Sequence, residues 1–254
     1  MTRKEELMMS LSTANLFDTV KKQFAFKLKA NIDAFSSLVG LQLLAILFSL
    51  GGSGSFMSSS QGMHLQVKYY SADVVIIFTV LWALVTAITI TTKQNRNNDF
   101  TFVTNRLSSG LSDILFLLIG SLVGAITAML SKYLPLVIAI LIFHEDLYSA
   151  PLDGSHMFLG FVMSFIYIFA VSSIGYLVGI LVQVNKLFAG FIPVLVIGSL
   201  FLDASMQREP TVISIFQFYV MEPSILFFIV KMIITTALLF LASIFILNRL
   251  EVKR

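Results

Sequence analysis

The chain has 254 residues, of which 57% are hydrophobic and 12% are charged, with a net charge of +3 and a mean hydropathy of +0.90. Soluble domains carry roughly 25% charged residues, so this composition excludes one water-soluble core and indicates a chain that lies mostly in lipid. The lack of cysteine excludes disulfides, thiolate metal sites and a cysteine nucleophile. We therefore expect an all-α membrane protein.

The first 33 residues are expected to form a cytoplasmic N-terminus that contains an amphipathic helix. Residues 1–23 are charged throughout and lack the apolar core of a cleavable signal peptide. Over residues 15–31, apolar residues recur at every fourth position and lysines are assigned to other faces of the helix. The two sets are Leu16, Val20, Phe24 and Leu28, and Lys21, Lys22, Lys27 and Lys29. This pattern predicts a helix along the inner headgroups, either as an orientation anchor or as a mechanical part.

Apolar runs of about 20 residues predict six transmembrane helices. They cover approximately residues 34–50, 72–92, 111–143, 157–184, 187–202 and 225–247. The third run is too long for one perpendicular crossing and contains Lys132 and Pro135. We expect it to cross once and to continue, kinked or bent, at the outer interface. Residues 1–254 then form a single transmembrane domain, with spans over 34–247 and a cytoplasmic tail over 248–254.

The positions of the basic residues predict that both termini are cytoplasmic. With six crossings and the N-terminus inside, 13 of the 17 Lys and Arg residues lie on the cytoplasmic side. The four exceptions are Lys68, Lys132, Arg208 and Lys231. This distribution follows the positive-inside rule. A seven-span alternative, made by splitting the third run, would place the basic C-terminal tail outside, so we prefer six spans.

The outer connections are short. Residues 51–62 (GGSGSFMSSSQG) predict a flexible Gly/Ser segment. Residues 144–156 (HEDLYSAPLDGSH) resemble a set of metal ligands, but their spacing matches no helical HExxH pattern, so no metal site is expected. Within residues 203–224, the apolar centre between Pro210 and Pro223 is too short to span and predicts a re-entrant or interfacial segment before the last span.

Two pairs of glycines have the spacing of helix-packing motifs. Gly120 with Gly124, and Gly175 with Gly179, stand four residues apart within predicted spans. Small residues at this spacing permit close approach of two helix backbones. We interpret both pairs as packing contacts within the chain rather than as a dimer interface.

Lys231 is an ionisable residue several positions inside the last predicted span. Charged groups at this depth mark a transport pathway or a buried partner, and Glu222, just before the span, is the candidate partner. Alternatively, the long Lys231 side chain snorkels to the outer interface. Both interpretations stay open from the sequence.

The sequence contains no recognisable catalytic set, so we do not expect an enzyme. The partners of Asp73 and Asp113, at the ends of spans, are not evident from the sequence. No GxxxxGK[ST] motif is present to bind nucleotide phosphates, and the spans contain no series of Asp, Glu or His suited to ion coupling. Uphill transport would therefore require energy from another subunit.

A polar segment between the second and third runs carries the most specific motif, which continues into the third run as DFTFVTNRLSSGLSDILFLL over residues 99–118. Together with the basic N-terminal helix and the stretch before the last span, it resembles the ABC-2 type permeases of ATP-binding-cassette exporters, which have a type V exporter-like architecture. Within that family, the segment is similar to permeases of Gram-positive peptide-export and antimicrobial-peptide-immunity systems, phenol-soluble modulin exporters among them.

The resemblance implies partners and a location. A cytoplasmic ABC ATPase would bind ATP and Mg²⁺, while this chain would bind no cofactor. Two permease copies and two ATPases would form the complex in the plasma membrane of a bacterium, in contact with lipids and a peptide substrate. Nucleic acid is not expected as a partner.

In that family, the second cytoplasmic segment supplies a coupling helix that inserts into a groove of the ATPase. The resemblance assigns this contact to Asp99, Phe100, Phe102, Val103, Asn105, Arg106 and Leu107. Phe100, Val103 and Leu107 would share one helical face, which is the pattern of a helix bound in a groove. The alternative is a polar loop whose apolar residues lie on the membrane surface.

The sequence therefore predicts the permease subunit of an exporter for hydrophobic or amphipathic peptides, such as phenol-soluble modulin-like cytolytic or antimicrobial peptides. Two alternatives stay open. One is the permease of a bacitracin- or lantibiotic-type immunity transporter, and the other is a membrane channel or scaffold component that works without ATP.

Overall fold

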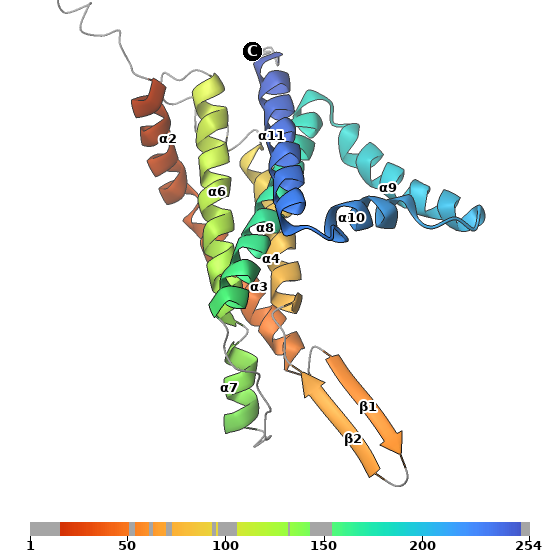
Figure 1. The fold of residues 1–254 in the computed structure, drawn as a ribbon. Helices are drawn as coiled ribbons and strands as arrows, with labels where there is room; N and C mark the ends of the chain where they lie inside the picture. The colour runs from red at the N-terminus through yellow and green to blue at the C-terminus, as the bar shows by residue number, and fades with distance from the viewer. Residues whose placement is uncertain are drawn as a thin grey trace, which may run out of the picture.

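A computed structural model of the chain describes residues 16–50, 54–60, 63–69, 73–92, 95, 106–131, 133–142 and 154–249. Across these residues the protein is a helical bundle with a two-stranded hairpin at one end (Figure 1). Six of the described helices are long and apolar enough to cross a membrane, which confirms the predicted number of spans. The fold therefore defines a multi-pass membrane protein.

The long helices follow the apolar runs, because a chain that crosses lipid must satisfy its backbone polar groups internally. These helices are α3 (Ile32–Ser49), α4 (Asp73–Ile90), α6 (Arg106–Ser131), α8 (Gly154–Val184), α9 (Phe188–Ser205) and α11 (Ile225–Arg249), and the amphipathic helix α2 (Leu16–Ala30) precedes them. The shorter elements are β1 (Gly54–Ser60), β2 (Met63–Tyr69), α7 (Tyr133–Leu141) and α10 (Thr211–Val220). All the spanning helices except α9 pack together in the bundle (Figure 1).

The third apolar run is divided between α6 and α7. Pro135 lies in the first turn of α7, where its missing N–H is tolerated, and its ring would clash with the carbonyl of Ser131, four residues earlier. Ser131 is the last residue of α6. With nine residues, α7 rises only about 14 Å and is too short to cross a bilayer core of about 30 Å. The run therefore contributes one spanning helix followed by a short helix.

A β-hairpin follows α3, in the region where a flexible Gly/Ser segment was predicted. β1 pairs antiparallel with β2, from Gly54 opposite Tyr69 to Ser60 opposite Met63. The prediction was wrong over residues 54–60 because it considered only the Gly/Ser composition of β1. The partner segment MHLQVKY alternates apolar and polar residues, which is the pattern of a strand.

Buried polar contacts connect three helices of the bundle. The Gln42 side chain of α3 is buried, and its Nε2 donates to the hydroxyl of Thr79 in α4 at 3.1 Å and to the hydroxyl of Thr127 in α6 at 2.9 Å. Trp82 Nε1 of α4 also donates to the carbonyl oxygen of Ala34 in α3 at 2.9 Å. In an apolar environment such paired groups fix the register of the helices, because leaving them without partners is costly.

Both glycine pairs face α4 of the same chain. A Cβ on Gly175 would lie 2.6 Å from the carbonyl oxygen of Leu84, and one on Gly179 would lie 2.0 Å from Thr91 Oγ1. On α6, a Cβ at Gly124 would approach Thr79 Cγ2 at 3.0 Å. The nearest atom to a Cβ at Gly120 would be Trp82 Cη2, at 3.4 Å. Glycine on α8 thus lets the α4 and α8 backbones come into close contact.

The α2 helix packs along α6 and meets α3 at a one-residue joint. Phe24 and Leu28 pack against a buried cluster that α4, α6, α8 and α11 share. At the joint, Asn31 has φ −112° and ψ 33°, and its Nδ2 donates to the carbonyl oxygen of Lys27 at 3.0 Å. The apolar stripe of α2 therefore contacts the bundle, and its contact with membrane headgroups stays a prediction.

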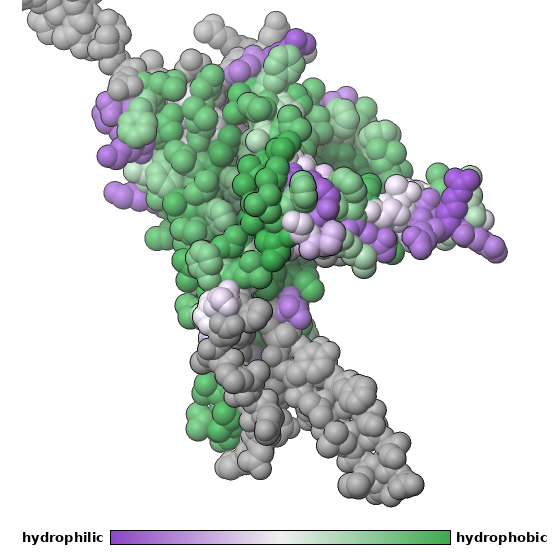
Figure 2. Space-filling model, in the orientation of Figure 1, coloured by the Kyte–Doolittle hydropathy of each residue, from purple (hydrophilic) through white to green (hydrophobic). Residues whose placement is uncertain are grey.

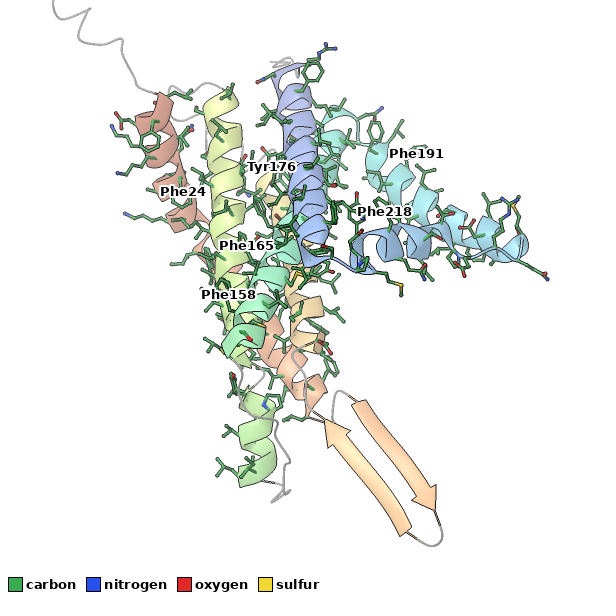
Figure 3. The ribbon with its side chains drawn as sticks, in the orientation of Figure 1. Phe24, Phe158, Phe165, Tyr176, Phe191 and Phe218 are labelled. Carbon is green, nitrogen blue, oxygen red and sulfur yellow. The ribbon has the colours of Figure 1, made fainter. Side chains whose placement is uncertain are left out.

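The α9 and α10 helices form an arm that projects from the side of the bundle (Figure 1). No residue of α9 is buried, and the labelled Phe191 lies on the arm, away from the bundle, whereas Phe218 lies where α10 comes close to α11 (Figure 3). In Figure 2 the surface of the bundle is mainly hydrophobic, with hydrophilic residues on α2 and toward the tip of the arm. The predicted segment before the last span is thus a ten-residue helix, α10, too short to cross the membrane.

Candidate functional site

A buried ion pair joins α2 to α6 near the start of α6. The Lys27 ammonium contacts Asp113 Oδ1, and the two side chains are only 4% and 10% exposed. Lys27 Nζ also donates to the carbonyl oxygen of Ser109 at 3.2 Å and to its hydroxyl at 3.4 Å. On α8, the Tyr176 hydroxyl donates to Asp113 Oδ2 at 3.2 Å. We call Lys27, Ser109, Asp113 and Tyr176 the α2–α6 node.

Helical spacing explains how this node forms. Ser109 and Asp113 are four residues apart on α6, so they lie on the same face one turn from each other. On α2, Lys27 follows Val20 by seven residues, and both are buried toward α6. Because each carboxylate oxygen of Asp113 accepts from a different helix, the node fixes α2 and α8 relative to α6.

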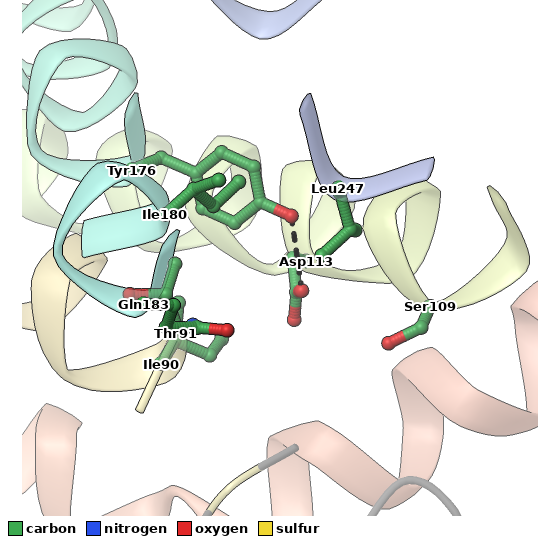
Figure 4. A pocket seen from close by; sticks show the side chains of 8 residues that line it. All are labelled: Ile90, Thr91, Ser109, Asp113, Tyr176, Ile180, Gln183 and Leu247. Atoms are coloured by element: carbon green, nitrogen blue, oxygen red, sulfur yellow. Dashed lines mark hydrogen bonds between the residues drawn. The ribbon is translucent and has the colours of Figure 1, made fainter. Parts of the chain in front are cut away.

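A small cavity lies beside the node (Figure 4). Its volume is about 20 Å³, enough for a single water molecule. It is lined by Ile90, Thr91, Ser109, Asp113, Tyr176, Ile180, Gln183 and Leu247, which come from α4, α6, α8 and α11. The cavity is far too small for a peptide, so the node is suited to holding helices in place rather than to binding a substrate.

A second ion pair joins Glu222, in the segment that follows α10, to Lys231 of α11. Lys231 contacts Glu222, donates to the carbonyl oxygen of Phe218 at 2.9 Å, and lies 3.8 Å from the centre of the Phe218 ring. The Lys231 and Glu222 side chains are 22% and 24% exposed, so solvent or headgroups reach this pair more easily than the α2–α6 node. We call Phe218, Glu222 and Lys231 the α10–α11 node. Whether Lys231 lines a pathway stays a prediction.

A hydroxyl pair strengthens the same connection. The Thr235 hydroxyl of α11 donates to the carbonyl oxygen of Lys231 at 2.8 Å, and its oxygen lies 3.2 Å from the hydroxyl of Tyr219 in α10. Because the Thr235 proton is already committed, the Tyr219 hydroxyl is the donor. The arm is therefore held at its α11 end by polar contacts, although α9 buries no residue.

Most of the predicted coupling residues lie outside the described part of the chain. These are Asp99, Phe100, Phe102, Val103 and Asn105. Arg106 is the first residue of α6, and Leu107 follows it with 36% of its surface exposed. The polar segment is therefore followed directly by a spanning helix, and its contact with an ATPase stays a prediction.

The histidine-containing outer segment is likewise mostly beyond the described residues, including His144, Glu145 and Asp146. Among the residues that the structure does describe, no group of three His, Asp or Glu side chains could hold a metal ion.

The pairing of Lys27 with Asp113 was missed from the sequence. We expected Lys27 to lie outside the apolar stripe of its helix, and this expectation was wrong. At about 100° per residue, Lys27 lies roughly 20° from Leu16, between Leu16 and Val20 on the helical wheel. A lysine inside an apolar stripe indicates a buried partner, and Asp113, at the start of a span, has the opposite charge.

Comparisons with protein-family models, curated protein sequences and solved structures found no significant match to this chain. The class of the protein therefore rests on its six helices that are long and apolar enough to cross a membrane.

Proposed function

We propose that this chain is the permease subunit of an ABC-2 type exporter that moves hydrophobic or amphipathic peptides out of the cell or the membrane. The observation that carries the proposal is the position of the polar segment directly before α6. This 26-residue helix is tied to α2 and α8 through the α2–α6 node. A displacement of the segment would therefore act on the contacts that α6 makes with α2 and α8.

The energy would come from a cytoplasmic ATPase that binds ATP and Mg²⁺. Closure of the ATPase dimer would push on residues 99–107, and the start of α6 would shift relative to the rest of the bundle. Two permease copies would then open a space between them, either outward or sideways into the membrane. The apolar surface of the bundle (Figure 2) suits substrates that partition into lipid, such as cytolytic or antimicrobial peptides of the phenol-soluble modulin kind.

The coupling contact is tested with the purified permease and the ATPase encoded next to it. We expect Phe102→Asp and Leu107→Asp to reduce permease-dependent ATP hydrolysis by at least about tenfold, because a charge replaces an apolar group that would fill a groove. Asn98→Asp is the matched control, since it adds the same charge in the same segment outside the predicted contacts. An unchanged hydrolysis rate in both apolar-to-Asp variants would overturn the coupling role.

Cellular phenotypes distinguish the remaining alternatives. If the chain exports peptides made by its own cell, deletion should cause those peptides to accumulate. Sensitivity to added bacitracin or lantibiotics without accumulation would instead indicate an immunity transporter. A channel or scaffold component would show neither an effect of the ATPase nor a dependence on its nucleotide.

A further inference from the structure

The face of α2 that packs against α6 carries two polar side chains, Lys27 and Gln23, which have opposite effects on the docking of α2. Lys27 is buried and paired with Asp113. Gln23, one turn earlier, is 4% exposed, and neither its amide nitrogen nor its amide oxygen bonds to any residue that the structure describes. By contrast, Lys21 and Lys22 of the same helix are exposed. The contact of α2 with α6 is thus not the simple burial of an apolar stripe.

These two residues act against each other when α2 is docked. A buried ion pair with additional hydrogen bonds specifies one arrangement, because any shift leaves a charge without its partner. A buried amide without partners opposes burial, since it can hydrogen-bond to water only when the helix moves away. Lys27 therefore sets the register of α2 on α6, and Gln23 weakens the docking in that register.

We infer that α2 is a detachable brace: Lys27, Asp113 and Tyr176 hold it on α6 in one register, and Gln23 keeps that docking weak enough to be reversed during transport. Lys27 and Asp113 are positioning residues, because they set the place of the first turns of α6 rather than contact a substrate. The role in transport rests on the proposed function, whereas the reversible docking of α2 does not.

The geometry shows why release of α2 would matter to the bundle. Asp113 accepts from α2 on one oxygen and from Tyr176 of α8 on the other. A Cβ on Gly110, in the same turn of α6, would lie 3.5 Å from Leu247 of α11 and 3.7 Å from the Tyr176 hydroxyl. When α2 leaves, Asp113 loses the Lys27 ammonium at the point where α6 meets α8 and α11.

Docking is tested first without any ATPase, on the full chain in lipid nanodiscs. The chain has no cysteine, so Val20→Cys places one thiol on the buried face and leaves Gln23 and Lys27 intact. Lys22→Cys, on the exposed face, is the matched control. We expect a soluble maleimide to react with the Val20→Cys variant at least about tenfold more slowly than with the Lys22→Cys variant, since α2 must detach before the buried thiol reacts.

A second substitution in the Val20→Cys background then tests the effects of Lys27 and Gln23 on the labelling rate separately. Asp113→Asn should increase labelling several-fold, and Gln23→Leu should decrease it below the starting rate. The charge-exchanged pair Lys27→Asp with Asp113→Lys, and the apolar pair Lys27→Met with Asp113→Leu, should each return labelling toward the starting rate. These paired variants keep the test valid where Asp113→Asn alone fails to fold.

Two results would overturn the inference that α2 is a detachable brace. If labelling of the Val20→Cys variant is the same with and without Asp113→Asn, the ion pair does not hold α2. If Gln23→Leu leaves the rate unchanged, Gln23 does not weaken the docking, and the amide has found a partner in solvent or elsewhere in the chain.

The transport role is tested by adding the partner ATPase with peptide. We expect trapped ATP to increase labelling of the Val20→Cys variant, and Asp113→Asn to reduce peptide export while ATP hydrolysis continues. A loss of both activities together with a lowered Tm would indicate a purely structural role and would overturn the positioning role. If docking behaves as inferred but ATP never alters labelling, the proposed coupling to an ATPase fails while the detachable brace stands.

Discussion

Asp113 shows how one carboxylate can organise three helices. It belongs to α6, accepts from Lys27 of α2, and accepts from the hydroxyl of Tyr176 in α8. Charge-assisted hydrogen bonds are roughly twice as strong as neutral ones, and a buried carboxylate that loses them is strongly destabilising. Substitutions at this position are therefore expected to alter the packing of α2 and α8 together.

Removal of the Tyr176 hydroxyl measures how much its hydrogen bond to Asp113 stabilises the protein. We expect Tyr176→Phe to lower the free energy of unfolding by about 1.5–3 kcal/mol, because a hydrogen bond to a buried charged group is lost. Denaturant unfolding of the purified chain in detergent would measure the change. Tyr167→Phe, on the same helix, is the control, since the Tyr167 hydroxyl makes no hydrogen bond to another described residue. Equal losses in the two variants would contradict a specific contribution from Asp113.

The contact between α4 and α8 depends on the absence of side chains at two positions. Gly175 and Gly179 bring the α8 backbone against Leu84 of α4 and against Thr91, the residue that follows α4. At Gly175 the opposing atom is a backbone carbonyl oxygen, which cannot rotate away, whereas at Gly124 it is the methyl group of Thr79. The α8 glycines therefore constrain the bundle more tightly than the α6 pair does.

Alanine substitutions test whether close packing at the α8 glycines stabilises the bundle. Alanine favours an exposed helix over glycine by about 1 kcal/mol, but an added group in a packed site costs about 1–3 kcal/mol or more. We expect Gly175→Ala to lower the Tm, because a clash at 2.6 Å with a backbone atom outweighs the gain in propensity. Gly198→Ala, on α9, should leave the Tm unchanged or raise it, since nothing lies within 4 Å of the added carbon. A decrease as large in Gly198→Ala would exclude close packing as the cause.

The spanning helices were predictable because lipid imposes both their length and their hydropathy. The hairpin was missed because the strand pattern lies in β2, while β1 itself is rich in Gly and Ser. The pairing of Lys27 with Asp113 was missed for a different reason. These residues are 86 positions apart, and hydropathy alone does not say which helices become neighbours.

The whole bundle has two chemically different ends. The α2 helix, the start of α6, the turn between α8 and α9, and the end of α11 lie at one end, while α7 and the hairpin lie at the other (Figure 1). The first end carries Lys186, Arg249 and the lysines of α2. By the positive-inside rule, this end is predicted to face the cytoplasm.

Thiol labelling from outside intact cells tests this orientation. In the cysteine-free chain, we expect a membrane-impermeant maleimide to label Arg208→Cys but neither Lys21→Cys nor Lys186→Cys. All three positions are exposed in the structure, so differences report sidedness rather than burial. Permeabilised cells provide the control, in which all three should react. The opposite pattern in intact cells would place the termini outside.

A rotation of α2 about the one-residue joint at Asn31 would displace each residue in proportion to its distance from the joint. The 15-residue α2 is about 22 Å long, so a rotation of about ten degrees about the joint moves its far end by about 4 Å. The same rotation moves a group one turn from the joint by only about 1 Å, and Lys27 is that close to Asn31. A displacement of about 1 Å near the ion pair would therefore accompany a displacement of about 4 Å at Leu16.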